Sequence, residues 1–299
     1  MKILIAGASG LVGTRLIEKL KDRGDTVITL VRDVAKKKSD TVVWNLMTGE
    51  CDPALFEGFD GVINLAGENI AGGRWTKKRK QSIYDSRVKG TSALCRILKN
   101  LKDPPKVLVN ASAIGFYGNT GKKEVDESDV AGNSFLSLVC RDWESATDPA
   151  AEKGIRVVNV RIGMVLSGSG GALQKMLVPF RLCLGGVIGS GKQYISWIAL
   201  EDLVDIILFS VENSSLKGPV NAVSPHPMTN AEFTKTLAGV LHRPAVFPVP
   251  AFAVKILLGE LGEELLLAGC RVKPGKLEAI GFPFAYPELQ PALKKIIQT

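Results

Sequence analysis

The feature of this sequence that most limits its fold is a glycine-spaced turn directly after the first apolar segment. Residues 2–6 read Lys-Ile-Leu-Ile-Ala, and Gly7, Gly10 and Gly13 follow them. From residue 11 to 23 apolar side chains recur at helical spacing, and Gly24 ends that pattern. A strand, a tight glycine turn and a helix in this order are typical of the first unit of a dinucleotide-binding α/β sheet.

Each glycine of this turn has a separate expected role. Gly7 permits the tight turn, Gly10 lets the backbone approach a pyrophosphate, and Gly13 lets the helix pack against the sheet. Free backbone N–H groups and the positive end of the helix then face the phosphates. The residues of the turn that we expect to contact a dinucleotide are Gly7, Ser9, Gly10, Leu11, Val12 and Gly13.

Strand-like apolar runs alternate with helical patterns along the first part of the chain. The expected strands are 2–6, 26–31, 61–65, 106–111 and 155–162, and the expected helices are 11–23, 83–101 and 134–151. This alternation predicts an α/β fold with a doubly wound parallel sheet. We assign residues 1–165, joined again by 200–223, to a Rossmann-type domain. Residues 166–199 and 224–299 are expected to form a smaller interleaved lobe on the substrate side.

The end of the second expected strand indicates which cofactor is bound. A carboxylate about 20 residues beyond the glycine turn would hold the ribose of NAD. Val31 and Arg32 close the strand instead, and an arginine there can pair with the 2′-phosphate of NADP. NADP is therefore the favoured cofactor. Asp33 keeps NAD open as the alternative, because a shift of one residue would restore the carboxylate.

Composition excludes several other classes of protein. The five cysteines are odd in number and lack a Cys-x-x-Cys pair, and only two histidines are present. This pattern indicates reduced thiols in a cytoplasmic protein and no metal site. The chain has 38 basic and 30 acidic residues, a net charge of +8. We interpret this balance as a basic face with one anionic ligand, and we expect neither a nucleic-acid nor a membrane partner.

Several short motifs together resemble a known family. They are Gly7–Gly13, Asn64–Ile70, Ser86-Arg87, Ala111–Gly118, Arg161–Leu166 and Ser196–Leu203. In this order they are similar to those of an atypical extended short-chain dehydrogenase/reductase, in the group labelled nucleoside-diphosphate-sugar epimerases. The tail from Gly218 to Pro287 resembles that group's C-terminal region. The resemblance covers nearly the whole chain.

The resemblance implies roles for individual residues. Leu65, Ala66 and Gly67 should pass close to the adenosine side of the cofactor. Arg87 resembles a residue of this group that reaches the NADP, and Met164 should lie near the nicotinamide. Considered without the resemblance, the turn at residues 65–67 would be an ordinary strand exit and Arg87 an exposed helix charge.

The family's usual catalytic pair is missing from this sequence. Hydride chemistry in the superfamily normally uses Tyr-x-x-x-Lys, in which the tyrosine transfers a proton and the lysine lowers its pKa. None of the four tyrosines has a lysine four residues later. If Glu144 marks the register of the helix after residue 134, Leu136 and Cys140 occupy the two catalytic positions. This departure argues against ordinary dehydrogenase or epimerase chemistry.

Ser112 and Tyr117 are the nearest substitutes. Ser112 ends the strand that usually carries the catalytic serine or threonine, and Tyr117 follows five residues later in a loop flanked by glycines. We hypothesise that these two hydroxyls polarise a substrate oxygen. The alternative is that Tyr117 is a packing residue. Cys140 is a weaker candidate nucleophile, because no histidine lies near it in the sequence.

The sequence therefore supports one leading function and two alternatives. The leading function is NADP(H)-dependent reduction or epimerisation of an unidentified small molecule, with a phosphate- or nucleotide-bearing substrate as one option. The first alternative is a non-catalytic NADP(H)-binding sensor or regulatory protein, which the missing tyrosine and lysine favour. The second alternative, nucleic-acid binding, depends on charge alone.

Overall fold

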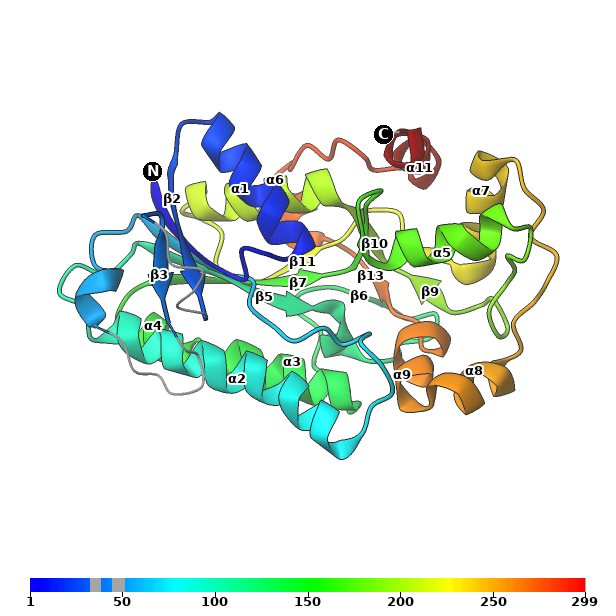
Figure 1. Ribbon diagram of the computed structural model, residues 1–299, viewed down its shortest axis with the longest axis horizontal. Helices are drawn as coiled ribbons and strands as arrows, with labels where there is room; N and C mark the ends of the chain where they lie inside the picture. Colours follow the sequence, from blue (N-terminus) through cyan, green and yellow to red (C-terminus); the bar gives the residue numbers. More distant parts are fainter. Residues whose placement is uncertain (33–38, 45–51, 299) are drawn as a thin grey trace.

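The computed structural model describes residues 1–32, 39–44 and 52–298, and its centre is a seven-stranded sheet (Figure 1). The strands lie in the order β11-β7-β5-β4-β1-β2-β3, and every neighbouring pair is parallel. Their bounds are β1 Lys2–Ala6, β2 Thr26–Val31, β3 Thr41–Val43, β4 Gly61–Asn64, β5 Val107–Ala113, β7 Arg156–Ile162 and β11 Gly218–Ala222. The predicted α/β fold with a doubly wound parallel sheet is confirmed.

The order of the strands reverses between β1 and β4. From β1 the chain adds β2 and β3 on one side, whereas β4, β5 and β7 extend the sheet on the other. Open α/β sheets bind ligands at the carboxyl ends of the strands where the order reverses. The segments that leave β1 and β4 therefore mark the position of the site.

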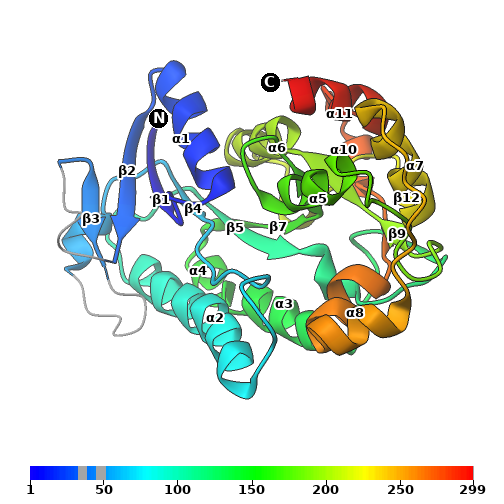
Figure 2. The ribbon, with the colours of Figure 1, turned by 45° about the vertical axis from the view of Figure 1, so that its right-hand side comes forward.

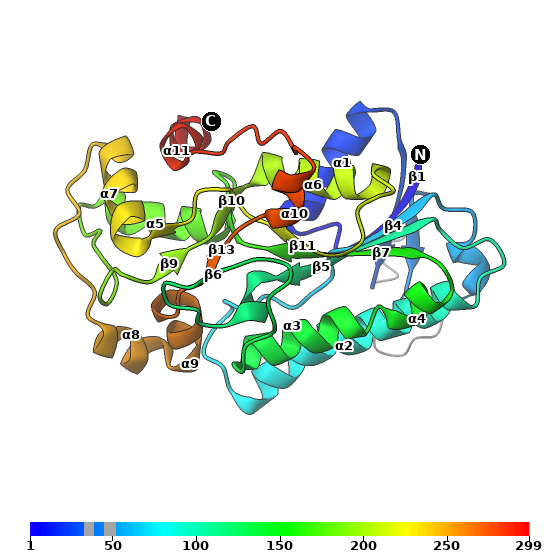
Figure 3. The ribbon, with the colours of Figure 1, turned by 180° about the vertical axis from the view of Figure 1, so that it is seen from behind.

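Helices cover both faces of this sheet (Figures 1 and 3). On one face lie α1 and α6, and on the other lie α2, α3 and α4; their bounds are α1 Leu11–Asp22, α6 Leu200–Glu212, α2 Lys77–Lys99, α3 Phe135–Ser145 and α4 Asp148–Glu152. Alternate residues of β1 enter the two cores, because Ile3 and Ile5 pack in one cluster and Leu4 in the other. Burial on both faces explains the continuous apolar run of this strand.

Most of the remaining elements form a smaller lobe beyond the carboxyl ends of the strands (Figure 2). They are η3 Ile114–Tyr117, β6 Glu124–Val125, β8 Met164–Leu166, α5 Gly171–Arg181, β9 Tyr194–Ile195, β10 Trp197–Ala199, β12 Met228–Thr229, α7 Asn230–Leu241, α8 Ala251–Leu258, α9 Glu260–Gly262, the π-helical turn η4 Glu263–Leu267, β13 Arg271–Val272 and α11 Leu289–Gln298. Two short helices, η2 Pro53–Phe56 and α10 Gly275–Ala279, pack instead in the cores of the large sheet. Trp197, Phe233 and Leu293 belong to the separate core of the smaller lobe. The chain leaves this lobe to place β11 at the edge of the large sheet. We propose for the folded chain the same domain division that the sequence suggested.

Two predicted helices differ from the structure for local reasons. The helix predicted over 83–101 begins earlier, at Lys77, because the Thr76 hydroxyl accepts a hydrogen bond from the Arg79 amide (3.2 Å) and caps it. The helix predicted over 134–151 is two helices, since the Thr147 hydroxyl bonds the Glu144 carbonyl (2.6 Å) and Pro149 follows. In the part of the chain that the structure describes, no helix is long and apolar enough to cross a membrane.

A row of buried asparagines crosses the middle of the sheet. Asn64 on β4, Asn110 on β5 and Asn159 on β7 are aligned in register. The Asn64 amide nitrogen donates to the Asn110 side-chain oxygen (2.8 Å), and the Asn110 nitrogen donates to that of Asn159 (3.0 Å). The Thr91 hydroxyl on α2 accepts from Asn64 (2.9 Å) and from the Trp143 indole on α3 (2.8 Å). The row thus links three strands to two helices.

Candidate functional site

The turn after β1 is packed so closely that two of its glycines are required by the protein itself. Gly7 has a φ of +82°, and a Cβ there would lie 2.5 Å from the Leu65 carbonyl carbon. A Cβ on Gly13 would lie 2.5 Å from the Gly7 carbonyl oxygen. Both distances are far below van der Waals contact, so a side chain at either position would displace backbone. The turns that leave β1 and β4 therefore touch each other.

Gly10 differs from these two, because a Cβ there would meet only the Gly7 carbonyl oxygen, at 3.5 Å. The packing of the protein therefore leaves space at Gly10. Gly10 is also the N-cap of α1 and supplies no side-chain hydrogen bond. In the described residues, the amides of Leu11, Val12 and Gly13 find no acceptor. Exposed Ser9 and Gly10 precede these amides, so the first turn of α1 presents free donors to an anion.

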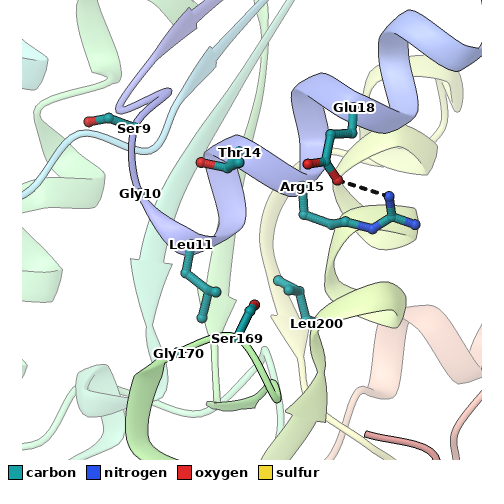
Figure 4. Close-up of a pocket in the computed structure, with 9 residues that line it drawn as sticks. All are labelled: Ser9, Gly10, Leu11, Thr14, Arg15, Glu18, Ser169, Gly170 and Leu200. Carbon is teal, nitrogen blue, oxygen red and sulfur yellow. Dashed lines mark hydrogen bonds and ion pairs between the residues drawn. The ribbon is translucent and has the colours of Figure 1, made fainter. Parts of the chain in front are cut away.

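A pocket of about 420 Å³ opens beside this turn (Figure 4). Its lining residues are Ser9, Gly10, Leu11, Thr14, Arg15, Glu18, Ser169, Gly170 and Leu200. In Figure 4 the Leu11 side chain points toward the backbone at Gly170, in the segment that precedes α5. The volume lies within the range of small-ligand pockets. Residues 169 and 170 were not among the sequence-predicted site residues.

Arg87 is held next to the turn after β4. A Cβ on Gly67 would lie 3.1 Å from the Arg87 guanidinium carbon, and this guanidinium stacks 5.1 Å from the Trp143 ring centre. Arg87 donates to the Ile83 carbonyl (3.3 Å). Within residues 1–32, 39–44 and 52–298, no carboxylate forms an ion pair with it. Burial lowers the pKa of Arg87, as expected for a desolvated cation without a bound counter-ion.

The other predicted cofactor residues lie at different strand ends. Val31 is half-buried at the end of β2, and Arg32 follows it with an exposed side chain. Asp33, which kept NAD open, lies outside the described residues. Met164 is half-buried at the start of β8, where its amide donates to the Ser196 carbonyl (2.9 Å). The Leu65–Gly67 turn meets both the glycine turn and Arg87.

Ser112 lies in a buried ionic network at the end of β5. Its hydroxyl donates to Glu144 Oε1 (2.7 Å), and only 2 % of the residue is exposed. Arg161 on β7 donates to both oxygens of the same carboxylate, through Nε and Nη2 at 2.8 Å each. This bidentate ion pair neutralises the buried Glu144 carboxylate. The Ser112 proton is therefore already donated within the protein.

Tyr117 belongs to the same network. Its hydroxyl donates to the Asn221 side-chain oxygen (2.7 Å) and accepts from Arg161 Nη1 (2.9 Å), and the residue is 4 % exposed. Burial raises the pKa of Tyr117 to about 12, which favours the protonated form. These contacts favour the alternative in which Tyr117 is a packing residue. The catalytic role of the two hydroxyls remains a prediction.

Leu136 and Cys140, which the sequence placed at the positions of the missing catalytic pair, lie against η3, which follows β5. A Cβ on Gly115 would lie 3.2 Å from Leu136 Cβ and 3.8 Å from the Cys140 sulfur. The helix register inferred from Glu144 stays a prediction. Burial raises the pKa of Cys140 to about 12, so the thiol stays protonated at neutral pH. Cys140, the weaker candidate nucleophile, is thus a buried thiol that stays unreactive at neutral pH.

Sequence reasoning missed the partners that organise this region. Glu144 was used only as a register marker, and Arg161 only as part of a motif. A charged residue inside an apolar strand is itself a signal, because a fully buried arginine almost always has a polar or acidic partner. Trp143, which stacks under Arg87, lies one residue before Glu144 and was not singled out.

Two family models match this chain. A family model described as the NAD dependent epimerase/dehydratase family matches residues 3–223, and one described as a domain of unknown function (DUF1731) matches 249–296. The epimerase family protein Mb2239 of Mycobacterium bovis is 44% identical over 97% of this chain and 96% of its own length.

Two solved structures are also similar over nearly the whole chain. Human epimerase family protein SDR39U1 (isoform 2), crystallised with NADPH, has a TM-score of 0.90 at 34% identity and covers 100% of this chain and 99% of its own. A nucleoside-diphosphate sugar epimerase of Corynebacterium glutamicum has a TM-score of 0.83 at 33% identity. That match covers 99% of this chain and 58% of the other.

Proposed function

The chain belongs to the NAD-dependent epimerase/dehydratase family, and from this premise we propose that it binds NADP(H) and acts as an oxidoreductase on a small molecule. The observation that carries the proposal is the first turn of α1. There the space at Gly10 lies next to three amides without acceptors in the described residues. The similar human protein that was crystallised with NADPH supports the same cofactor.

The site residues fit such a cofactor. We propose that the amides of Leu11, Val12 and Gly13 hold the diphosphate, as helix N-termini do in this type of sheet. Arg32, exposed at the end of β2, is proposed to pair with the ribose 2′-phosphate. The Leu65–Gly67 turn would lie along the adenosine side. Arg87 would face an anionic or hydroxyl group of the cofactor, because its stacking on Trp143 holds it in place without a carboxylate partner among the described residues.

The chain's own groups limit what happens at the reacting end. A bound NADP(H) would supply a hydride donor or acceptor at its nicotinamide. Met164 is proposed to lie against that ring. Leu136 and Cys140 are proposed to occupy the catalytic positions, and neither offers a proton at neutral pH. Ser112 and Tyr117 are proposed as polarising hydroxyls only if a substrate replaces Glu144 or Asn221 as their acceptor.

The experiment that tests this proposal is a titration of the purified protein with NADPH and NADH, followed by fluorescence. We expect NADPH to bind more tightly than NADH. Arg32→Ala should weaken NADPH binding by about 10- to 150-fold, since a hydrogen bond to a charged group contributes about 1.5–3 kcal/mol. The matched control is Arg96→Ala, which removes another exposed arginine and should leave both affinities unchanged.

Turnover is tested separately, by offering carbonyl compounds to the NADPH-bound protein and following the absorbance of the reduced nicotinamide. Oxidation with any substrate supports the oxidoreductase. Tight NADPH binding without oxidation by any compound would support the non-catalytic NADP(H)-binding alternative. Failure to bind either nucleotide would refute both.

A further inference from the structure

Most of the exposed large apolar side chains in the described residues lie in the part of the molecule farthest from β3 in Figure 1. Nine of the fourteen exposed large apolar side chains in the described residues lie in two short stretches, and they are 37–69 % exposed. The first stretch, 178–184, contributes Val178, Leu182 and Leu184. The second, 246–257, contributes Val246, Phe247, Val249, Phe252, Ile256 and Leu257. We call these two stretches together the apolar end surface.

The two stretches are joined by backbone contacts although they are far apart in sequence. The Phe247 amide donates to the Gly185 carbonyl (3.2 Å), and the Val249 amide donates to that of Val187 (2.8 Å). Gly186 allows this approach, because a Cβ there would lie 1.8 Å from the Phe247 carbonyl oxygen. The segment that follows α5 and the segment that precedes α8 are therefore held side by side.

The sequence in and around the two stretches is basic. Residues 171–192 and 242–259 contain Lys175, Arg181, Lys192, Arg243 and Lys255, and no aspartate or glutamate. Lys255 is paired with Glu263 outside these ranges (2.9 Å). In the described part of the chain, Arg181 and Arg243 are exposed and have no carboxylate partner. Exposed phenylalanine and leucine beside unpaired arginine is the composition of surfaces that lie in the headgroup region of membranes.

We propose that the apolar end surface docks on an anionic lipid surface, with Phe252 and Ile256 inserted between headgroups. These two residues are four apart on α8, so they lie on one side of the helix, and they are 66 % and 67 % exposed. Arg181 and Arg243 then face lipid phosphates. A second copy of this chain fits less well. In a two-fold contact this surface meets its own copy, and residues 171–192 and 242–259 offer no carboxylate to pair with Arg181 and Arg243.

The test is co-sedimentation of the full chain with vesicles of phosphatidylcholine alone and of phosphatidylcholine mixed with phosphatidylglycerol. We expect binding to the anionic vesicles, weakened by salt, and much weaker binding to the neutral ones. Arg181→Gln with Arg243→Gln should reduce partitioning onto anionic vesicles by roughly five-fold per residue. Phe252→Ser with Ile256→Ser should reduce it by at least ten-fold.

The matched control pair is Leu55→Ser with Ile280→Ser, which removes two exposed apolar side chains away from the apolar end surface and should bind vesicles like the parent. Far-UV circular dichroism and a urea melt of every variant check that the fold is intact. Neither measurement depends on nucleotide binding, so this proposal can fail or hold independently of the proposed function. Two outcomes would overturn the proposal. One is no difference between anionic and neutral vesicles. The other is a dimer in sedimentation velocity that the Phe252→Ser, Ile256→Ser pair dissociates while vesicle binding is absent.

Discussion

Replacing Gly10 by alanine should separate the stability of the protein from its binding of the cofactor. At Gly7 and Gly13 a Cβ would overlap backbone atoms at 2.5 Å, so those substitutions disturb the fold itself. At Gly10 the nearest atom is 3.5 Å away, which is an ordinary contact. Its φ of −80° is also open to alanine. The added methyl group should therefore occupy only space that a diphosphate would use.

The two effects have different magnitudes. As an N-cap, glycine stabilises the folded protein by about 1 kcal/mol relative to alanine. Alanine in turn stabilises the folded protein by about 0.4–1 kcal/mol, because it reduces the conformational entropy of the unfolded chain. These terms nearly cancel, so the free energy of unfolding should change by less than about 1 kcal/mol. In the complex, the methyl group would push the diphosphate away from the amides of α1. Loss of one charge-assisted hydrogen bond, about 1.5–3 kcal/mol, raises the Kd for NADPH by about 10- to 150-fold.

The assay combines a fluorescence titration with NADPH and a urea melt of Gly10→Ala. Gly13→Ala is the contrasting variant, and it should lose stability and binding together. Gly239→Ala, inside α7 where a Cβ meets nothing within 4 Å, is the control that should leave NADPH binding unchanged. An unchanged Kd for Gly10→Ala would refute the reasoning that its open space is a phosphate site. A loss of stability as large as that of Gly13→Ala would refute the packing argument.

Three further predictions concern buried polar groups. Arg87→Met should weaken NADPH binding about ten-fold or more. It should also raise the free energy of unfolding by about 1 kcal/mol, because a desolvated cation is removed. NADPH titrations and urea melts measure the two effects, and a loss of stability together with the loss of affinity would contradict the prediction. Tyr117→Phe should cost about 1–3 kcal/mol in the same melt and leave NADPH affinity unchanged, since Asn221 and Arg161 lose their partner; unchanged stability would argue against the packing role. The Cys140 thiol, with a pKa raised by burial from 9.0 to about 12, stays protonated in the fold while the unfolded chain ionises. The free energy of unfolding should therefore fall as pH rises above 9, by about 1.4 kcal/mol per pH unit for this thiol. In urea melts with a reducing agent, Cys140→Ala should make this dependence on pH shallower. An identical pH dependence in the variant and the parent would count against the prediction.

Local patterns were enough to predict most of the large sheet. The strand predicted over 26–31 has the same bounds as β2. Its β-branched and apolar residues form one uninterrupted run, which Gly24 precedes and Arg32 follows. The start of α2 was missed because its first turn, Lys77–Lys80, is basic and carries no apolar periodicity. Thr76 was the available signal, as a capping residue before that run.

Prediction was weaker where a site depends on residues that are distant in sequence. The glycine turn is a local structure, so its geometry follows from a seven-residue spacing. The acceptors of the Ser112 and Tyr117 hydroxyls lie on α3 and β11, and no spacing rule connects them. The apolar end surface was missed for the same reason. Its two stretches are each unremarkable in sequence, and only the backbone pairing near Gly186 joins them. We therefore expected no membrane partner from composition.

The row formed by Asn64, Asn110 and Asn159 has a consequence for how the sheet assembles. Apolar neighbours such as valine and isoleucine would tolerate a strand displaced by two positions, because the same face stays buried. Here such a slip would leave buried amides without acceptors, at about 1–3 kcal/mol for each unsatisfied group. The three side chains therefore favour a single register of β4, β5 and β7, in which all of these hydrogen bonds form. Thr91 also bonds the Trp143 indole, and this ring stacks against Arg87. Correct strand pairing and the position of the Arg87 guanidinium are therefore established together.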